Sequence, residues 1–173
     1  MDALLDILKI VLPALIVFFT AYFLIRSFLE NEFKTMMQEN KNANRSTSLP
    51  LQLQAYERLI LFLERISPAN LITRTGRTDI SASRLQMVYL QNIRNEFEHN
   101  MSQQLYISSD AWEYIKSAKE DALRLINKAA SETAEGKTGA ALSEKILELS
   151  LKSKDNRIEE AKTFLKEEAR KLF

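Results

Sequence analysis

The sequence predicts an all-α protein in which one N-terminal transmembrane helix precedes a cytoplasmic helical bundle. Three observations support this prediction. The 173 residues include 17 alanines and 25 leucines, but only three valines and three glycines. This composition favours helices over sheets. Residues 10–25 form one uncharged apolar segment, and the apolar residues that follow recur at helical spacing.

The apolar segment at residues 10–25 contains 14 hydrophobic side chains among 16 residues. As a helix it covers about 24 Å, and extending it back to Leu4 adds about two turns. We therefore expect residues 4–28 to contact the lipid bilayer. A buried core helix would need a comparably apolar partner, which the sequence lacks. Asp2 and Asp6 occupy the region that is basic in a cleaved signal peptide, so we expect an uncleaved anchor.

Flanking charges predict the orientation of this anchor. Only Lys9 lies on its short N-terminal side, whereas Arg26, Lys34, Lys41 and Arg45 follow it. The positive-inside rule then places the N-terminus outside and the C-terminal part in the cytoplasm.

The chain after the anchor divides into three parts. Apolar residues continue at helical spacing to about residue 39, which predicts that the anchor and a juxtamembrane helix together occupy residues 1–39. Residues 40–48 are polar without apolar periodicity and predict a flexible linker. Residues 49–173 are long enough for one helical domain.

The first half of this domain predicts two long helices. Pro50 suits the first turn of a helix that ends at Ser67-Pro68, and a short helical turn and a loop around Gly76 follow. A second helix is expected from about residue 79 to Leu105. The side chains expected to be buried are Leu53, Tyr56, Leu59, Ile60, Leu63 and Ile66 in the first helix and Leu85, Tyr89, Ile93, Phe97 and Met101 in the second. Apolar residues on further faces of the second helix predict contacts with several neighbours.

The second half predicts three more helices. Residues 108–110 supply capping side chains for a helix that ends before a loop at residues 131–139. Two helical segments follow from Ala140, with a break near residues 155–156. The inner-face residues of the three helices are Trp112, Ile115, Ala118, Ala122, Leu125, Ile126, Ala129, Leu142, Ile146, Leu149, Ile158, Ala161, Leu165, Ala169 and Leu172.

Composition and motifs exclude several functions. Lysines and arginines (24) nearly balance aspartates and glutamates (23), which argues against a nucleic-acid partner. The chain has no cysteine and one histidine, so we expect no metal site. No cofactor is expected either, because Gly136-Lys137-Thr138 lacks the earlier glycine of a P-loop, where Ser131 stands instead.

Arginines cluster around the predicted loop at Gly76. Arg74, Arg77 and Arg84, with Arg65 nearby, could contact phosphate or lipid headgroups near an anionic leaflet. The alternative is an ordinary solvated loop, because short basic clusters are common.

The strongest local motif is the segment Arg94-Asn95-Glu96-Phe97-Glu98-His99. It resembles the Arg-Asn-x-x-x-His signature of the HEPN superfamily, all-helical bundles that include metal-independent ribonucleases acting as two joined copies. The resemblance implies that Arg94 stabilises phosphate charge, that His99 is a general acid and base, and that Asn95 orients the two.

A structural role accounts for the same residues. Arg94 can pair with Glu98, and Glu96 with His99, along one helix. Arg94 and His99 lie about 140° apart around a helix, so one surface does not readily present both.

Most of residues 1–130, and more weakly the C-terminal helices, resemble an uncharacterised family of small membrane-anchored proteins from Bacteroidota. The resemblance rests on the anchor and on residues 53–68 and 93–108, and it implies a single-span protein of the bacterial inner membrane without an assigned activity. The sequence therefore favours a non-enzymatic interaction or scaffold protein with an unknown protein partner or a second copy of itself. The alternatives are a membrane-anchored HEPN-like ribonuclease and a lipid-associated regulator.

Overall fold

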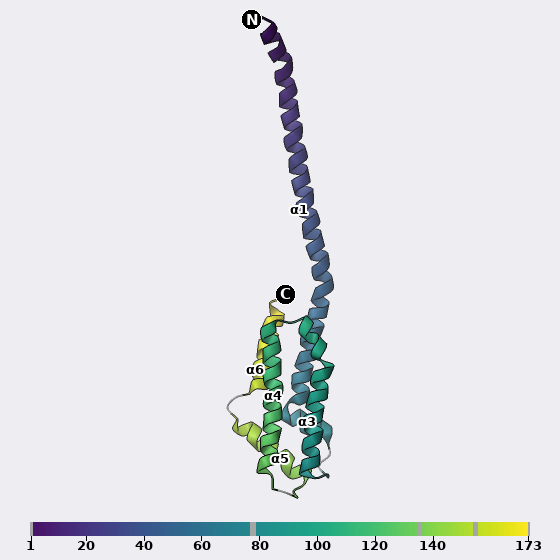
Figure 1. Cartoon of the computed structure of the whole chain (residues 1–173), viewed down its shortest axis with the longest axis vertical. Coiled ribbons are helices and arrows are strands. Elements are labelled where there is room, and N and C mark those ends of the chain that lie inside the picture. The colour runs from purple at the N-terminus through teal and green to yellow at the C-terminus, as the bar shows by residue number, and fades with distance from the viewer. Residues whose placement is uncertain (1, 77–78, 135, 154–155, 173) are drawn as a thin grey trace. The chain divides into compact units, whose positions relative to one another are not determined.

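The computed structural model describes residues 2–76, 79–134, 136–153 and 156–172, and at residues 2–14, 33–35 and 37–47 it describes the backbone alone. In this part of the chain the regular elements are all helices, joined by short loops, and the one β-type pairing is an isolated bridge (Figure 1). The helices are α1 (Asp2–Ile66), α2 (Pro68–Thr75), α3 (Ala82–His99), the 3-10 helix η1 (Met101–Leu105), α4 (Ser109–Glu132), α5 (Gly139–Lys152) and α6 (Arg157–Arg170). The all-α fold class predicted from the sequence is confirmed.

The chain divides into two units, Met1–Ser48 and Leu49–Phe173. In the first unit the described apolar side chains between Leu15 and Leu29 are exposed. Among the described residues, no helix combines the length and the apolar character that crossing a membrane requires. The side chains of residues 10–14, which open the predicted anchor, lie outside the described ones.

The backbone of residues 40–48, for which the sequence predicted a flexible linker, is helical. These residues are polar, but they include neither glycine nor proline. A polar segment has no apolar face to pack against a neighbour, but its backbone can still adopt helical geometry. Glycine or proline would disfavour that backbone geometry itself.

The second unit is a bundle in which α4 packs against α3, α5 and α6. Alanines make this close packing possible, because four of the six buried residues of α4 are Ala111, Ala118, Ala122 and Ala129. Helix α3 packs against α4 and α5, and its Phe97 also meets Phe62 of α1. The prediction that this helix contacts several neighbours is confirmed.

Helix α3 ends at His99, six residues earlier than predicted. The side chain of Asn100 is buried and its Nδ2 donates a hydrogen bond of 2.8 Å to the carbonyl oxygen of Glu96. The asparagine side chain thus donates to a carbonyl oxygen that a backbone N–H would bond if the helix continued. Such a competing side-chain bond favours the end of the helix. Met101 therefore lies in η1 with an exposed side chain, although the continued stripe predicted its burial.

The loops before α3 and α5 are joined by an isolated antiparallel bridge between Ser81 and Thr138. Backbone hydrogen bonds run from Ala82 N to Lys137 O (3.0 Å) and from Gly139 N to Ile80 O (2.7 Å). The two bridge residues are also the N-caps of α3 and α5, where their hydroxyl oxygens accept from backbone N–H groups.

Two buried tyrosines of the core, Tyr56 and Tyr89, make polar contacts. The Tyr89 hydroxyl and the Ser143 hydroxyl lie 2.9 Å apart in a buried hydrogen bond between α3 and α5. Burial, followed by the charge of Glu168 and a hydrogen bond with it, raises the pKa of Tyr56 to about 12. Tyr56 therefore stays neutral over the physiological pH range.

Candidate functional site

Three residues of the strongest sequence motif, Asn95, Glu96 and His99, line a polar hollow between α1, α2 and α3. The hollow has a volume of about 380 Å³ and is lined by Arg65, Arg74, Asn92, Asn95, Glu96 and His99. Apart from Glu96, every one of these side chains carries at least one hydrogen-bond donor. The hollow is therefore chemically suited to an anion more than to a cation.

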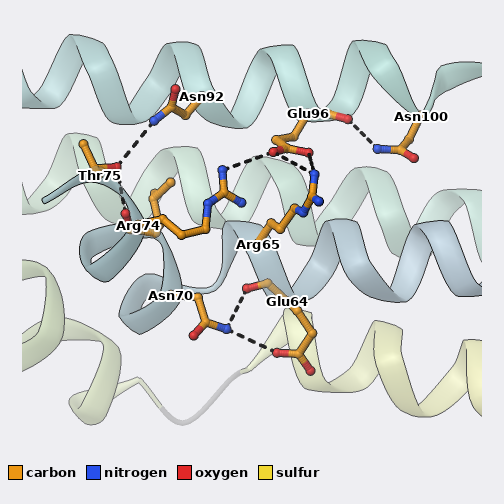
Figure 2. Close-up of polar contacts among 9 residues, drawn as sticks. Glu64, Arg65, Asn70, Arg74, Thr75, Asn92, Glu96 and Asn100 are labelled. Carbon is orange, nitrogen blue, oxygen red and sulfur yellow. Dashed lines mark hydrogen bonds and ion pairs between the residues drawn. The ribbon is translucent and has the colours of Figure 1, made fainter.

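Glu96 holds the two arginines of this hollow (Figure 2). Arg65 Nη1 of α1 lies 3.1 Å and 3.3 Å from the two carboxylate oxygens of Glu96, and Arg74 Nη2 of α2 lies 3.1 Å from Oε1. The Glu96 side chain is only 17% exposed, whereas both arginine side chains are about half exposed. One carboxylate thus joins three helices and leaves one positive charge in excess.

Neighbouring amides fix the walls of the hollow. Asn92 Nδ2 donates to Thr75 Oγ1 at the end of α2 (3.4 Å), as Figure 2 shows. The Asn95 carbonyl oxygen accepts a hydrogen bond of 2.6 Å from Gln91 Nε2. The Asn95 Nδ2 group donates no hydrogen bond to another described residue, so its N–H donors are available to a ligand.

The structure separates the three residues of the predicted HEPN-like set. Asn95 and His99 are exposed and line the hollow together, whereas Arg94 is exposed on α3 and is not among its lining residues. The monomer therefore places His99 near Arg65 and Arg74, and it does not bring His99 and Arg94 to a shared hollow. Glu96, expected to pair with His99, binds the two arginines instead.

The predicted phosphate or lipid cluster is also divided. Arg74 lies in the hollow, and Arg84 is exposed in the first turn of α3, outside the lining residues. Arg77 lies outside the described residues. The sequence did not reveal Glu96 as the residue that binds Arg65 and Arg74, because these partners are 31 and 22 residues apart and no local spacing links them.

Replacing Glu96 by glutamine is expected to lower the free energy of unfolding by about 1 kcal/mol, because a neutral amide cannot balance two guanidinium groups. Urea unfolding of the full chain in detergent, followed by the fluorescence of the single tryptophan, measures this. Glu98→Gln is the matched control, since Glu98 is exposed on the same helix. A control effect as large as that of Glu96→Gln would contradict the bridging role.

No metal centre is evident in the described part of the chain, where His, Asp and Glu side chains do not gather in groups of three that could hold an ion. The hollow contains one carboxylate and one histidine beside two arginines, a set that repels a cation.

Comparison with known proteins places the chain in one family. A search of curated proteins and a search of solved structures each found no significant match. A family model described as "Family of unknown function (DUF7935)" matches residues 2–172. Because the match extends over nearly the entire length, the chain belongs to this family of unknown function.

Proposed function

We propose that this protein is a helical interaction module, tethered to the bacterial inner membrane by its N-terminal segment and without catalytic activity of its own. The observation that carries the proposal is the exposure of consecutive apolar side chains in α1. Leu15, Ile16, Val17, Phe18 and Phe19 are each about half exposed or more. Five consecutive residues at 100° per residue cover every side of a helix, so no single protein surface would bury them all.

Two polar contacts in α1 fit a lipid environment. The Thr20 hydroxyl donates a 2.6 Å hydrogen bond to the carbonyl oxygen of Ile16 within the helix, so this group needs no water. Arg26 pairs with Glu30 at 3.1 Å directly after the apolar segment, where a membrane interface would begin. The excess of basic residues after the segment supports a cytoplasmic position for residues 49–173 and an external N-terminus.

Carbonate extraction of membranes tests the tether. The full chain is expected in the membrane pellet, and Val17→Asp/Phe18→Asp is expected in the soluble fraction, because each charge near the centre of a spanning helix costs about 2.5–3.5 kcal/mol. The matched control is Leu147→Asp/Leu151→Asp, which makes the same change at two exposed leucines of α5. Extraction of the wild-type chain, or retention of the Val17→Asp/Phe18→Asp variant, would refute the tether. Alkaline phosphatase fused to the C-terminus should be inactive if that end is cytoplasmic.

A metal-independent ribonuclease is the second candidate, favoured by the presence of Asn95 and His99 in one hollow with two arginines. In this reading Arg65 and Arg74 would contact the phosphate and His99 would transfer a proton. Arg94 would have a lesser role because it lies outside the lining residues. RNA cleavage by the full chain in a metal chelator, lost in His99→Ala and kept in Arg94→Ala, would support it. Equal cleavage by wild type and His99→Ala, or none, would eliminate it.

A further inference from the structure

A second surface lies between α4 and α6, away from the hollow at Glu96. Tyr114 of α4 and Phe164 of α6 form a stacked aromatic pair, with ring centroids 4.5 Å apart and an interplanar angle of 22°. Tyr114 is 37% exposed and Phe164 is half-buried. Two adjoining hollows of about 350 Å³ and 540 Å³ both include this pair in their lining. Exposed aromatic side chains beside such hollows are typical anchor points of protein interfaces.

Every charged residue that lines these two hollows is acidic; the five are Asp110, Glu113, Glu159, Glu160 and Glu167. Three of these carboxylates already bind cations of the same chain: Glu113 binds Lys116 (2.6 Å), Glu159 binds Lys162 (2.8 Å), and Glu160 binds Arg157 (3.0 Å). Asp110 and Glu167 have no ion-pair partner among the described residues. Two uncompensated negative charges therefore remain beside the aromatic pair.

The antiparallel packing of α4 and α6 places these two charges toward the same end of the aromatic pair, one at each of the two hollows. Figure 1 shows the two helices side by side with opposite chain directions, and their contact is extensive. Asp110 precedes Tyr114 by about one turn, and Glu167 follows Phe164 by nearly one turn. Both carboxylates consequently lie toward the same end of the aromatic pair. An arginine can stack its guanidinium on such rings while its N–H groups reach nearby carboxylates.

We propose that the aromatic pair, with Asp110 and Glu167, is the docking surface for a basic segment of a partner protein, and that an arginine of this segment stacks on the rings. The sign of the charge selects the partner, because uncompensated carboxylates repel nucleic acid and anionic lipid headgroups and attract lysine and arginine. The inference rests on the proposed role as an interaction module and specifies where and by what chemistry the partner binds.

Anisotropy of a dye-labelled peptide of alternating arginine and glycine, titrated with the full chain in zwitterionic detergent, tests the surface. Asp110→Asn/Glu167→Gln is expected to weaken binding about tenfold, and Tyr114→Leu about fivefold. The matched control is Glu98→Gln/Glu144→Gln, which removes the same charge from exposed positions of α3 and α5 and should change the Kd less than about twofold. Near-ultraviolet circular dichroism of each variant verifies the fold.

Three outcomes would overturn the inference. The first is that the peptide does not bind the wild-type chain. The second is that both double variants weaken binding equally. The third is that the peptide does not bind but the chain forms a dimer, which Asp110→Asn/Glu167→Gln abolishes. The last would assign the surface to a second copy. Carbonate extraction is independent of these residues, so failed peptide binding with an intact membrane tether refutes the docking surface alone. Extraction of the wild-type chain refutes the tether instead.

Discussion

Phe62→Ala is expected to lower the free energy of unfolding of the helical bundle by about 3–5 kcal/mol. Phe62 is 1% exposed, and its ring centroid lies 6.0 Å from that of Phe97. Phe97 in turn stacks on Trp112 at 5.3 Å, so three helices meet in this aromatic cluster. Truncation removes the buried ring and leaves a cavity that the surrounding helices fill only in part.

Urea unfolding of the full chain in detergent, followed by Trp112 fluorescence, measures this loss directly. The chain has one tryptophan, and it lies within the cluster that the substitution disturbs. Leu61→Ala is the matched control, because the adjacent Leu61 is 47% exposed and its truncation should cost within about 0.5 kcal/mol. Similar losses in the two variants would show that α1 is not anchored to the bundle through Phe62.

Glu64→Gln/Glu159→Gln is expected to lower the free energy of unfolding at neutral pH by about 2–3 kcal/mol, because it leaves a buried ammonium group without a charged partner. Lys162 is 5% exposed, and its Nζ lies 2.8 Å from the carboxylates of both Glu64 and Glu159. Because both glutamates are about half exposed, the expected loss lies at or below the lower end of the roughly 3–5 kcal/mol typical of a broken buried ion pair.

The stabilisation of the fold by Lys162 with Glu64 and Glu159 should depend on pH, and the direction of this dependence identifies its cause. Burial alone would lower the pKa of Lys162, but the hydrogen bonds and charges of Glu159 and Glu64 outweigh burial and raise it. In the wild type the stabilisation is therefore complete below the ordinary lysine pKa and is lost as the pH rises beyond it. In the double variant burial dominates, the folded-state pKa falls, and the free energy of unfolding should increase from pH 7 to pH 10.

Urea unfolding of both proteins at pH 7 and pH 10 tests this expectation. The difference between wild type and variant should shrink at the higher pH. Glu160→Gln serves as control, since Glu160 pairs with the half-exposed Arg157 rather than with a buried group. A difference that is constant with pH would mean that Lys162 is not stabilised by the two carboxylates.

Periodicity and capping chemistry predicted most of the helical bundle from the sequence. Ser108 is the N-cap of α4, and Leu85, Tyr89 and Ile93 are buried on α3 as their spacing predicts. Phe62 was not among the predicted core residues, because it lies beside the expected stripe of its helix and is buried by the neighbouring helices. The end of α3 was misplaced because a single side-chain hydrogen bond of Asn100 decides it.

The candidate site was only partly predictable. Asn95 and His99 line one hollow because both lie on one helix at i, i+4, whereas Arg94 of the same motif is not among the lining residues. Arg65 and Glu96 converge only through packing of α1 on α3, and the burial of Lys162 depends on Glu64 from a distant helix. Such contacts between helices leave no local signal in the sequence. The same limit applies to the aromatic pair, whose two rings are 50 residues apart.

The bridge between Ser81 and Thr138 makes the first turns of α3 and α5 thermodynamically interdependent. Each of these residues caps its own helix while its neighbours hydrogen-bond to the other loop. Fraying of either helix start therefore removes support from the other, so the energetic effects of cap substitutions at Ser81 and Thr138 should not add. Two helices of the bundle thus begin at one shared point, which fixes their axial register relative to each other, and the hydrogen bond between Tyr89 and Ser143 joins the same two helices further along.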